Sequence, residues 1–412
     1  MKKYVKTLVL LFLVCFSFSN VKANAVEEPN INAEGAILID ASTGEVLFGK
    51  NENKSFEPAS TTKVMTALIA LENCKLDETV KVTQDFTSID GTAIGLLTGD
   101  ELTMKDLLLG LIMESGNDCA NAIAIHISGS LEDFAKLMNK KAKEIGALNT
   151  TFKNPSGLPD EGHITTPHDL ALIMREALKN KDFVEISKVP YHEIVMKNNS
   201  ERKIIVNNKN HMINKNSKYY YQYATCGKNG YTTVANHTYV CAAEKDGHVL
   251  VASFLNALDK NQNFHDMQTV FDYGFNNYSL VNLYKKDQEV SKFKIKDNLE
   301  ISLLAPEDIN YLVKKGEEKN VHADITIEEK DLSKSSFNKY DPILKGTISV
   351  NGKEFTTTDL LAGESVEYVP LISKKSFPVL SVAAGAIVGL GLIFAGMKFS
   401  NKKFSFLKKG KH

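Results

Sequence analysis

The chain has 412 residues, of which 43% are hydrophobic and 24% are charged, an ordinary globular composition. This length exceeds what one compact core usually serves, so we expect two domains with accessory segments. Lysine and arginine number 49 against 50 acidic residues, which gives a net charge of −1. That balance excludes a generally basic nucleic-acid-binding protein and a disordered acidic chain, so no nucleic-acid partner is expected.

The first 25 residues have the form of a secretory signal peptide. Three lysines within residues 2–6 precede an apolar run over residues 8–18, and Ala23-Asn24-Ala25 follows as a cleavage site. A buried N-terminal helix is the alternative. We therefore predict that residues 1–25 are a signal peptide and that the body of the chain is exported.

A hairpin and a buried helix are predicted next. Residues 36–49 contain two apolar strands around a turn at Ser42-Thr43-Gly44. Pro58 opens a helix that runs to about residue 73, and residues 64–71 within it are apolar except for Thr66. A helix that is apolar nearly all round is buried on all sides, so we expect it at the domain centre.

Further helices are predicted in the middle of the chain. Thr103 and Asp106 form a capping box ahead of an apolar helix over residues 104–113. A turn over residues 114–117 leads to a helix over residues 118–127, and another helix covers residues 169–179.

From about residue 203 the hydrophobic period becomes that of strands. Strands over residues 238–242 and 249–254 flank Asp246-Gly247, a strong hairpin turn signal. A helix over residues 264–275 closes this domain, which we place at residues 26–280. Strands near both ends and helices between them predict an α+β domain with one antiparallel sheet.

Residues 281–370 are predicted to form a small all-β domain, because helix signals are absent and short alternating strands recur there. These strands cover residues 300–304, 323–327 and 347–350, and Asn351-Gly352 marks a hairpin turn.

The C-terminal end has the pattern of a membrane anchor. A linker over residues 371–376 leads to residues 377–397, which carry no charge and are long enough to cross a bilayer as a helix. Six lysines follow in residues 398–412, so this tail is predicted to be cytoplasmic and the body extracytoplasmic. Gly385 and Gly389 form a G-x-x-x-G pattern that would let two copies pack as a homodimer, although glycines are common in such spans.

Cysteine and histidine spacings do not indicate a metal site. A body of this size does not need disulfides, so we expect free, mostly buried cysteines, with a Cys226–Cys241 bridge as the least implausible alternative. His163 and His168 lack a third ligand at zinc spacing and are interpreted as ordinary loop histidines. No metal or organic cofactor is expected. The cysteines that follow the predicted leader are Cys74, Cys119, Cys226 and Cys241.

Ser60 and Lys63 form an S-x-x-K pair at the start of the first predicted helix. A spacing of three places both side chains on one helix face. A serine hydroxyl becomes a good nucleophile when a base takes its proton, and Lys63 serves as that base only if its pKa falls from about 10.4 to near 7. The alternative for this pair alone is a capping serine beside a surface lysine.

Two later segments supply matching polar groups. Ser115 and Asn117 lie in the turn between two predicted helices, where side chains can reach a cleft; alternatively, one of them caps the next helix. Lys228-Asn229-Gly230 lies at the edge of the strand region. Lys228 would bind a carboxylate and lower the pKa of Lys63, and Gly230 would let a substrate backbone approach, whereas the alternative is an ordinary turn lysine and glycine.

In this order the segments resemble the low-molecular-mass penicillin-binding proteins, the serine-type D-alanyl-D-alanine carboxypeptidases. The resemblance implies a transpeptidase/β-lactamase-like domain, an antiparallel sheet with helices on both faces, followed by a β domain and an anchor. It also implies removal of the terminal D-alanine from peptidoglycan stem peptides and inhibition by β-lactam antibiotics. The matching segments are residues 57–66, 113–118, 154–158 and 227–232, within a likeness that covers about residues 30–275.

The resemblance implies catalytic roles for three residues. Ser60 would be the nucleophile, Lys63 its general base, and Ser115 the group that passes a proton to the departing D-alanine. The backbone N–H groups of Ser60 and Tyr231 would form the oxyanion hole. An acyl-enzyme on Ser60 would then be hydrolysed by water.

The implied substrate-binding residues include one departure from the family pattern. Asn117 would position the peptide and Lys228 would face its terminal carboxylate. The family has Thr or Ser where this chain has Asn229, before Gly230. Loss of that hydroxyl contact would cost about 1.5–3 kcal/mol, so we expect a weakened or retuned enzyme. A β-lactamase and a non-catalytic wall-binding relative are the alternatives.

Overall fold

A five-stranded antiparallel sheet forms the centre of the first of two units in the structure, a computed structural model that describes residues 27–368. The sheet joins the beginning of the chain to segments about 200 residues later, since Leu38 lies opposite Ala252. Both hairpins predicted for this sheet are confirmed. In spatial order the strands are β2 (Val46–Lys50), β1 (Gly35–Asp40), β9 (His248–Ala257), β8 (Asn236–Lys245) and β7 (Ala224–Thr232).

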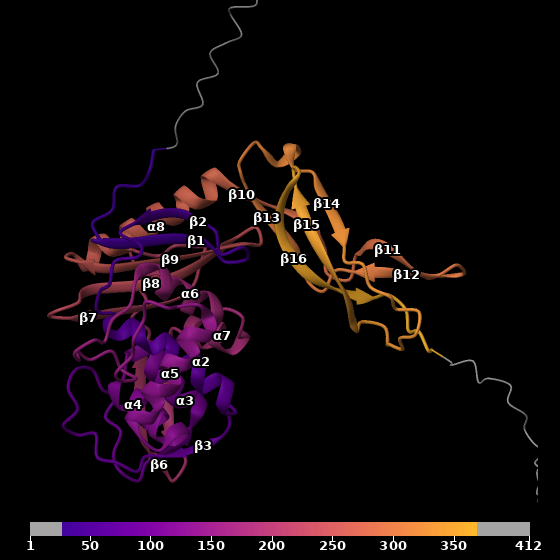
Figure 1. The fold of residues 1–412 in the computed structure, drawn as a ribbon. Helices are drawn as coiled ribbons and strands as arrows, with labels where there is room; N and C mark the ends of the chain where they lie inside the picture. The colour runs from indigo at the N-terminus through magenta and orange to yellow at the C-terminus, as the bar shows by residue number, and fades with distance from the viewer. Residues whose placement is uncertain (1–26, 369–412) are drawn as a thin grey trace, which may run out of the picture. The chain divides into compact units, whose positions relative to one another are not determined.

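Alternate side chains of the sheet enter two separate hydrophobic cores. Ile37 and Ile39 pack among the helices on one face, whereas Leu38 packs with α8 (Lys260–Asn277) on the other. In Figure 1, α8 lies along one face of the sheet and the remaining helices of this unit lie on the opposite side. The predicted antiparallel sheet with helices on both faces is therefore confirmed.

The helix that follows Ser60 lies at the centre of the helical layer. Every residue of α2 from Lys63 to Ala70 is buried, as its apolar sequence predicts. The Thr103 hydroxyl accepts a hydrogen bond from the Asp106 N–H and caps α3, also as predicted. The helical layer consists of α2 (Lys63–Asn73), α3 (Met104–Leu109), α4 (Asn117–Ser128), α5 (Leu131–Ile145), α6 (Pro167–Ala177) and α7 (Lys181–Lys188).

Two predicted helices differ from the structure where they approach the pocket described below. The helix expected from Pro58 begins as a 3₁₀ turn, η1 (Ala59–Thr62), and the helix expected over residues 104–113 widens into a π-helical turn, η2 (Gly110–Glu114). Both irregular turns lead into or out of catalytic candidates, since Ser60 lies in η1 and Ser115 ends η2.

Several elements of this unit were not predicted. Helices α5 and α7 are capped by the side chains of Ser130 and Asn180. The other unpredicted elements are the paired strands β3 (Thr79–Lys81) and β4 (Glu101–Thr103), the hairpin of β5 (Tyr191–Met196) and β6 (Asn199–Asn207), and the 3₁₀ turn η3 (His211–Ile213).

The second unit is built on another five-stranded sheet, as expected for the β domain. Ile301, Leu303 and Leu360 lie in its hydrophobic core. The first unit extends to Lys286 and also includes Glu307–Asp324 and Val350–Lys353. The elements of this C-terminal part are β10 (Tyr278–Tyr284) paired with β13 (Ile309–Lys314), the sheet β11 (Glu289–Lys296), β12 (Leu299–Leu304), β16 (Lys353–Ala362), β15 (Pro342–Val350) and β14 (Ala323–Ile327), and the 3₁₀ turn η4 (Glu318–Asn320).

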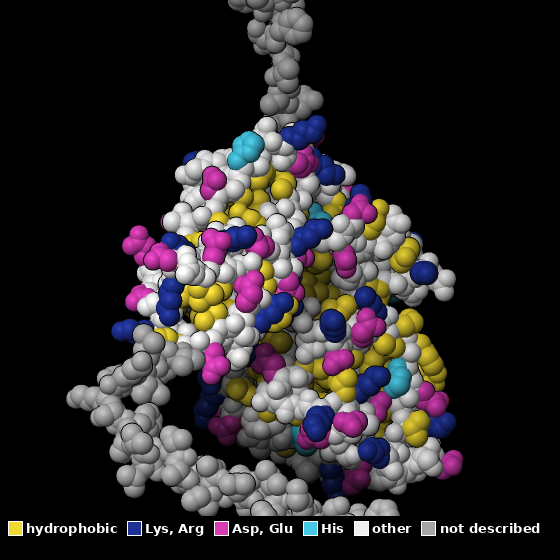
Figure 2. Space-filling model, turned by 90° about the vertical axis from the view of Figure 1, so that its right-hand side faces the viewer, with side chains coloured by type: hydrophobic (Ala, Val, Ile, Leu, Met, Phe, Trp, Pro, Cys, Tyr) yellow, Lys and Arg dark blue, Asp and Glu magenta, His cyan; other side chains and the backbone are white. Residues whose placement is uncertain are grey.

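The predicted leader, linker, membrane span and basic tail lie outside the described residues. Within residues 27–368, no helix combines the length and apolar character that a membrane crossing requires. The four cysteines within the described residues are free, as expected, although Cys74 is only partly buried. On the face that Figure 2 shows, acidic and basic side chains are interspersed, in keeping with the net charge of −1.

Candidate active site

The serine of the S-x-x-K pair lies in a strained turn. Ala59, directly before Ser60, has a φ of 49°, a left-handed conformation that is uncommon for a residue with a side chain. The hydroxyls of Thr61 and Thr238 both donate to the Pro58 carbonyl, at 2.6 and 2.9 Å. These contacts hold the turn in place, and such strain is typical of functional sites.

Lys63 is buried directly behind Ser60 and is held by three oxygen atoms. Its Nζ lies 3.0 Å from Oγ of Ser60, 2.7 Å from Oδ1 of Asn117 and 2.6 Å from the carbonyl oxygen of Ser156. Burial, and then the nearby Lys228 ammonium, lower the pKa of Lys63 well below its ordinary value. A neutral amine has two N–H groups for the two carbonyl-type acceptors, which leaves its lone pair for the Ser60 hydroxyl proton.

Asn117 begins α4 and connects Lys63 to the loop before β4. Its Oδ1 accepts from Lys63, its Nδ2 donates to the Asp90 carbonyl at 2.6 Å, and its backbone N–H donates to the Thr92 carbonyl at 2.7 Å. The neighbouring Asp118 carboxylate accepts backbone hydrogen bonds from three successive residues of the same loop, Ile94, Gly95 and Leu96. The start of α4 therefore positions both the lysine and one wall of the site.

The segment over residues 154–158 supplies a backbone group that the sequence could not assign. Oδ1 of Asn154 accepts from the Gly157 N–H at 2.8 Å and from the Ser156 hydroxyl at 3.1 Å, which orients the Ser156 carbonyl toward Lys63. Gly157 has a φ of 85°, and a Cβ atom there would lie 1.8 Å from the Ala59 carbonyl oxygen. Only glycine fits this close contact between the segment and the turn that carries Ser60.

His163 lies behind the same turn. Its Nδ1 accepts from the Lys153 N–H at 3.4 Å, so its Nε2 donates to Oγ1 of Thr62 at 3.1 Å. Burial lowers the pKa of His163 to about 4, so the ring is neutral near pH 7. This histidine, interpreted from sequence as an ordinary loop residue, supports the turn before Lys63.

Strand β7 forms the other side of the site. Lys228 is 1% exposed and donates to the Asn229 carbonyl at 2.7 Å, and burial lowers its pKa to about 7. A Cβ atom at Gly230 would lie 2.6 Å from the Ser60 backbone nitrogen and 2.5 Å from Oγ1 of Thr238. The glycine therefore lets β7 lie directly beside the Ser60 amide.

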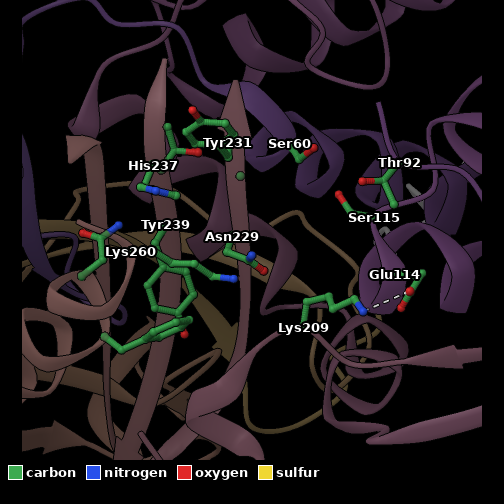
Figure 3. A pocket seen from close by; sticks show the side chains of 14 residues that line it. Ser60, Thr92, Glu114, Ser115, Lys209, Asn229, Tyr231, His237, Tyr239 and Lys260 are labelled. Carbon is green, nitrogen blue, oxygen red and sulfur yellow. Dashed lines mark ion pairs between the residues drawn. The ribbon is translucent and has the colours of Figure 1, made fainter. Parts of the chain in front are cut away.

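A pocket of about 380 Å³ opens between β7, η1, η2 and the start of α8. Of the predicted site residues, Ser60, Ser115, Asn229, Gly230 and Tyr231 line it. The others, Lys63, Asn117 and Lys228, are buried and are not among its lining residues. Figure 3 shows Ser60 and Ser115 on one side of this pocket and Asn229 facing them from β7.

Sequence reasoning missed several lining residues, because their proximity depends on how the sheet packs. Lys209 pairs with Glu114 at 3.1 Å, the interaction that is dashed in Figure 3. Lys260, in the first turn of α8, has no ion-pair partner among the described residues. The pocket therefore offers one unpaired cation at the start of α8, where the Asp259 carboxylate caps the helix. The missed lining residues are Thr92, Glu114, Lys209, His237, Thr238, Tyr239, Lys260, Asn263 and Phe264.

Comparisons with known proteins show which family this chain is similar to. Residues 22–259 match the family model of D-alanyl-D-alanine carboxypeptidase, and residues 278–368 match the model of the C-terminal domain of penicillin-binding protein 5. The D-alanyl-D-alanine carboxypeptidase DacF of Bacillus subtilis is 34% identical over 331 residues, which cover 78% of this chain and 83% of the relative. The carboxypeptidase DacC of Escherichia coli is 29% identical over 390 residues, covering 91% of this chain and 90% of the relative.

Two solved structures are also similar to this chain. The D-alanyl-D-alanine carboxypeptidase of Mycobacterium tuberculosis is 34% identical with a TM-score of 0.56, covering 61% of this chain and 94% of the other. Penicillin-binding protein 5 of Haemophilus influenzae shares the fold over 83% of this chain and 99% of its own, with a TM-score of 0.67 and 23% identity.

Proposed function

Because the chain belongs to the D-alanyl-D-alanine carboxypeptidase family, we propose that it removes the terminal D-alanine from peptidoglycan stem pentapeptides through an acyl-enzyme on Ser60. The observation that carries this proposal is the Lys63 amine. It lies 3.0 Å from the Ser60 hydroxyl, and its pKa is well below the ordinary lysine value, so it has both the position and the basicity of a general base.

The chemistry proceeds in two stages. In the first, the Ser60 hydroxyl proton passes to Lys63 Nζ while Oγ bonds to the carbonyl carbon between the two D-alanines. Backbone N–H groups of Ser60 and Tyr231 stabilise the resulting oxyanion. The close approach of β7 to the Ser60 amide at Gly230 supports this assignment.

Collapse of this intermediate breaks the C–N bond. The proton held by Lys63 passes through the Ser115 hydroxyl to the departing amine, and D-alanine leaves. Water then attacks the Ser60 ester, which releases the shortened peptide and restores the hydroxyl proton. Ser115 lines the pocket at the end of η2, with a φ of 69° that is consistent with a constrained catalytic position.

Recognition of the terminal carboxylate is assigned to groups on the pocket wall. Asn229 contributes an amide donor, and Lys260 contributes an unpaired ammonium at the start of α8. Lys228 is buried, so its main effect on the reaction is the lowering of the Lys63 pKa by its charge.

A purified-enzyme experiment tests this function directly. The full chain is incubated with a disaccharide-pentapeptide and the products are analysed by mass spectrometry. Loss of one alanine by the intact chain, and none by Ser60→Ala, is the expected result. An unchanged pentapeptide would contradict the proposal.

β-Lactams resemble the substrate carbonyl and are expected to acylate Ser60. Fluorescent penicillin should label the intact chain and leave Ser60→Ala unlabelled. A weakly active or non-catalytic wall-binding relative is the second candidate, favoured by the amide of Asn229 where the family has a hydroxyl. Labelling without alanine release would favour this candidate, whereas rapid penicillin hydrolysis without a stable adduct would identify a β-lactamase.

The cellular location is also part of the proposal. Residues 1–25 would direct export, residues 377–397 would anchor the chain, and residues 398–412 would remain cytoplasmic. Gly385 and Gly389 would bring two spans together as a homodimer. External protease should remove the body from intact protoplasts and leave a short membrane-bound C-terminal fragment; complete protection of the body would exclude this topology.

A further inference from the structure

Among the described residues, a cluster of metal-ligating side chains lies outside the pocket. Cys74 follows the last residue of α2, Glu78 lies in the loop before β3, and His126 lies in the last turn of α4. One ligand atom from each of the three lies within 4.8 Å of the other two, and Nε2 of His126 is 2.8 Å from Oε1 of Glu78. We infer that these three residues form a zinc-binding site.

The donor set favours Zn²⁺ over harder cations. Thiolate sulfur, imidazole nitrogen and carboxylate oxygen are the three ligand types of protein zinc, at about 2.0–2.3 Å from the metal. Tetrahedral binding then requires the donor atoms to lie about 3.3–3.8 Å apart, so the Glu78 and His126 side chains would move slightly apart from their 2.8 Å contact to take up an ion. Three protein ligands leave the fourth position for water.

The site is open to solvent and partly organised. The Glu78 and His126 side chains are 39% and 27% exposed, so they can turn toward an ion from outside. Cys74 is held by its N–H, which donates to the Ala70 carbonyl, and Oε2 of Glu78 accepts from the Lys75 N–H. Met104 N–H donates to the Glu78 carbonyl, which fixes the loop backbone.

The accessible thiol distinguishes this cluster from an ordinary surface pair. An exposed histidine–glutamate pair contributes little stability on its own. Of the four cysteines that the structure describes, Cys119, Cys226 and Cys241 are buried in the hydrophobic cores, whereas Cys74 retains access to solvent beside two further ligand types.

A metal ion here would connect the distal ends of two catalytic helices. Helix α2 begins at Lys63 and α4 begins at Asn117, and these first residues are hydrogen-bonded to each other at 2.7 Å. Zinc at Cys74 and His126 would join the same two helices at their other ends, about 16 Å away. We expect it to raise the midpoint of thermal unfolding by several degrees and to change penicillin acylation less than twofold.

Cobalt titration tests the site on the full chain, purified metal-free in detergent micelles. The expected result is a thiolate-to-cobalt charge-transfer band that saturates at one Co²⁺ per chain and disappears when Zn²⁺ is added. Cys74→Ser should abolish the band, and Glu78→Gln and His126→Gln should each weaken Co²⁺ affinity at least tenfold. His265→Gln, an exposed histidine on α8, is the matched control and should leave affinity unchanged.

Other outcomes would overturn the inference. The first is an intact chain that shows no thiolate-to-cobalt band, and the second is a band that persists in Cys74→Ser. The third is a band that neither Glu78→Gln nor His126→Gln weakens, because that result would indicate an adduct of the thiol alone. Penicillin labelling of Cys74→Ser at the wild-type rate without metal shows that this variant is folded. In a folded Cys74→Ser variant, Zn²⁺ should no longer raise the unfolding midpoint; an unchanged shift would place the metal elsewhere.

Discussion

Nζ of Lys63 lies 2.6 Å from the carbonyl oxygen of Ser156, an atom 93 residues away in the chain. A carbonyl oxygen accepts hydrogen bonds and cannot donate them, so it fixes the direction of one lysine N–H. Oδ1 of Asn117 lies 2.7 Å from the same nitrogen and fixes the direction of a second N–H. The remaining direction of the nitrogen is the one that faces Ser60.

Replacement of Lys63 by methionine is expected to lower the penicillin acylation rate by about 10²–10⁴-fold, because methionine keeps the side-chain length and removes the base. Stopped-flow labelling with fluorescent penicillin measures this rate. Circular dichroism serves as the control for folding. A folded Lys63→Met variant that acylates within threefold of wild type would exclude Lys63 as the base.

The pH dependence of acylation reports the pKa of Lys63. Acylation requires the neutral amine, so its rate should rise with pH through the lowered pKa of Lys63. In Lys228→Met the neighbouring positive charge is gone and the pKa of Lys63 rises. The acidic limb of the profile should therefore move to higher pH by about one unit, equivalent to about 1.4 kcal/mol.

Lys209→Met is the control for this shift, because the Lys209 ammonium is already paired with Glu114. An acidic limb that stays in place in Lys228→Met, or moves to lower pH, would refute the coupling between the two lysines.

The pH dependence of stability gives an independent check on the buried Lys228. The pKa of Lys228 is about 7 in the folded chain, so the unfolded chain binds more protons between pH 7 and its ordinary pKa. The free energy of unfolding should rise with pH across that window, and less steeply in Lys228→Met.

We expect Asn229 to limit turnover, because in the proposed carboxylate site it stands where the family has a hydroxyl. Asn229→Thr supplies the smaller hydroxyl donor, and turnover of a pentapeptide should increase by roughly ten- to a hundredfold. Steady-state D-alanine release measures the change. Asn229→Val, whose side chain has the shape of threonine without the hydroxyl, should not reproduce the increase in turnover. A threonine variant that turns over no faster than wild type would mean that the amide already fulfils this role.

The unpaired charge of Lys260 is predicted to bind the terminal carboxylate. Lys260→Met should raise KM for a free-acid peptide by about three- to thirtyfold, with a much smaller effect on the matching C-terminal amide. Lys209→Met serves as the comparison, since Glu114 already neutralises that lysine. Equal losses for acid and amide in Lys260→Met would show that this lysine does not recognise the carboxylate.

Gly230→Ala tests the close approach of β7 to the nucleophile. The added methyl would lie 2.6 Å from the Ser60 nitrogen and 2.5 Å from Thr238 Oγ1, so the strand must move away. We expect a cost of about 1–3 kcal/mol in stability and a loss of acylation at least tenfold. Denaturant unfolding measures the stability, and acylation is measured under conditions below the unfolding transition. Normal acylation at reduced stability would place the oxyanion contacts elsewhere.

The local parts of the site could be predicted from the sequence, whereas its assembly could not. The three-residue spacing of Ser60 and Lys63 and the cap at Thr103 depend on one helical turn each, and both follow from periodicity. The cap at Ser130 uses the same pattern, with its hydroxyl accepting from Asp133, so α5 was also predictable.

Other features depend on the sheet bringing distant segments together. The Ser156 carbonyl is a backbone atom, and backbone atoms leave no side-chain pattern to recognise. Lys260 reaches the pocket only because β9 pairs with both β1 and β8 and thereby places the start of α8 beside β7. The burial of Lys228 likewise follows from tertiary packing, since the motif alone is compatible with an exposed lysine.

The distribution of the Lys63 partners along the chain also affects when the enzyme becomes reactive. Asn117, Ser156 and Lys228 lie 54, 93 and 165 residues after Lys63. In a partly synthesised or unfolded chain, Lys63 is hydrated, keeps its proton near pH 7 and leaves Ser60 an ordinary alcohol. We therefore expect Ser60 to become reactive only after residues beyond Lys228 have folded into β7, so incomplete chains would carry the serine without its reactivity.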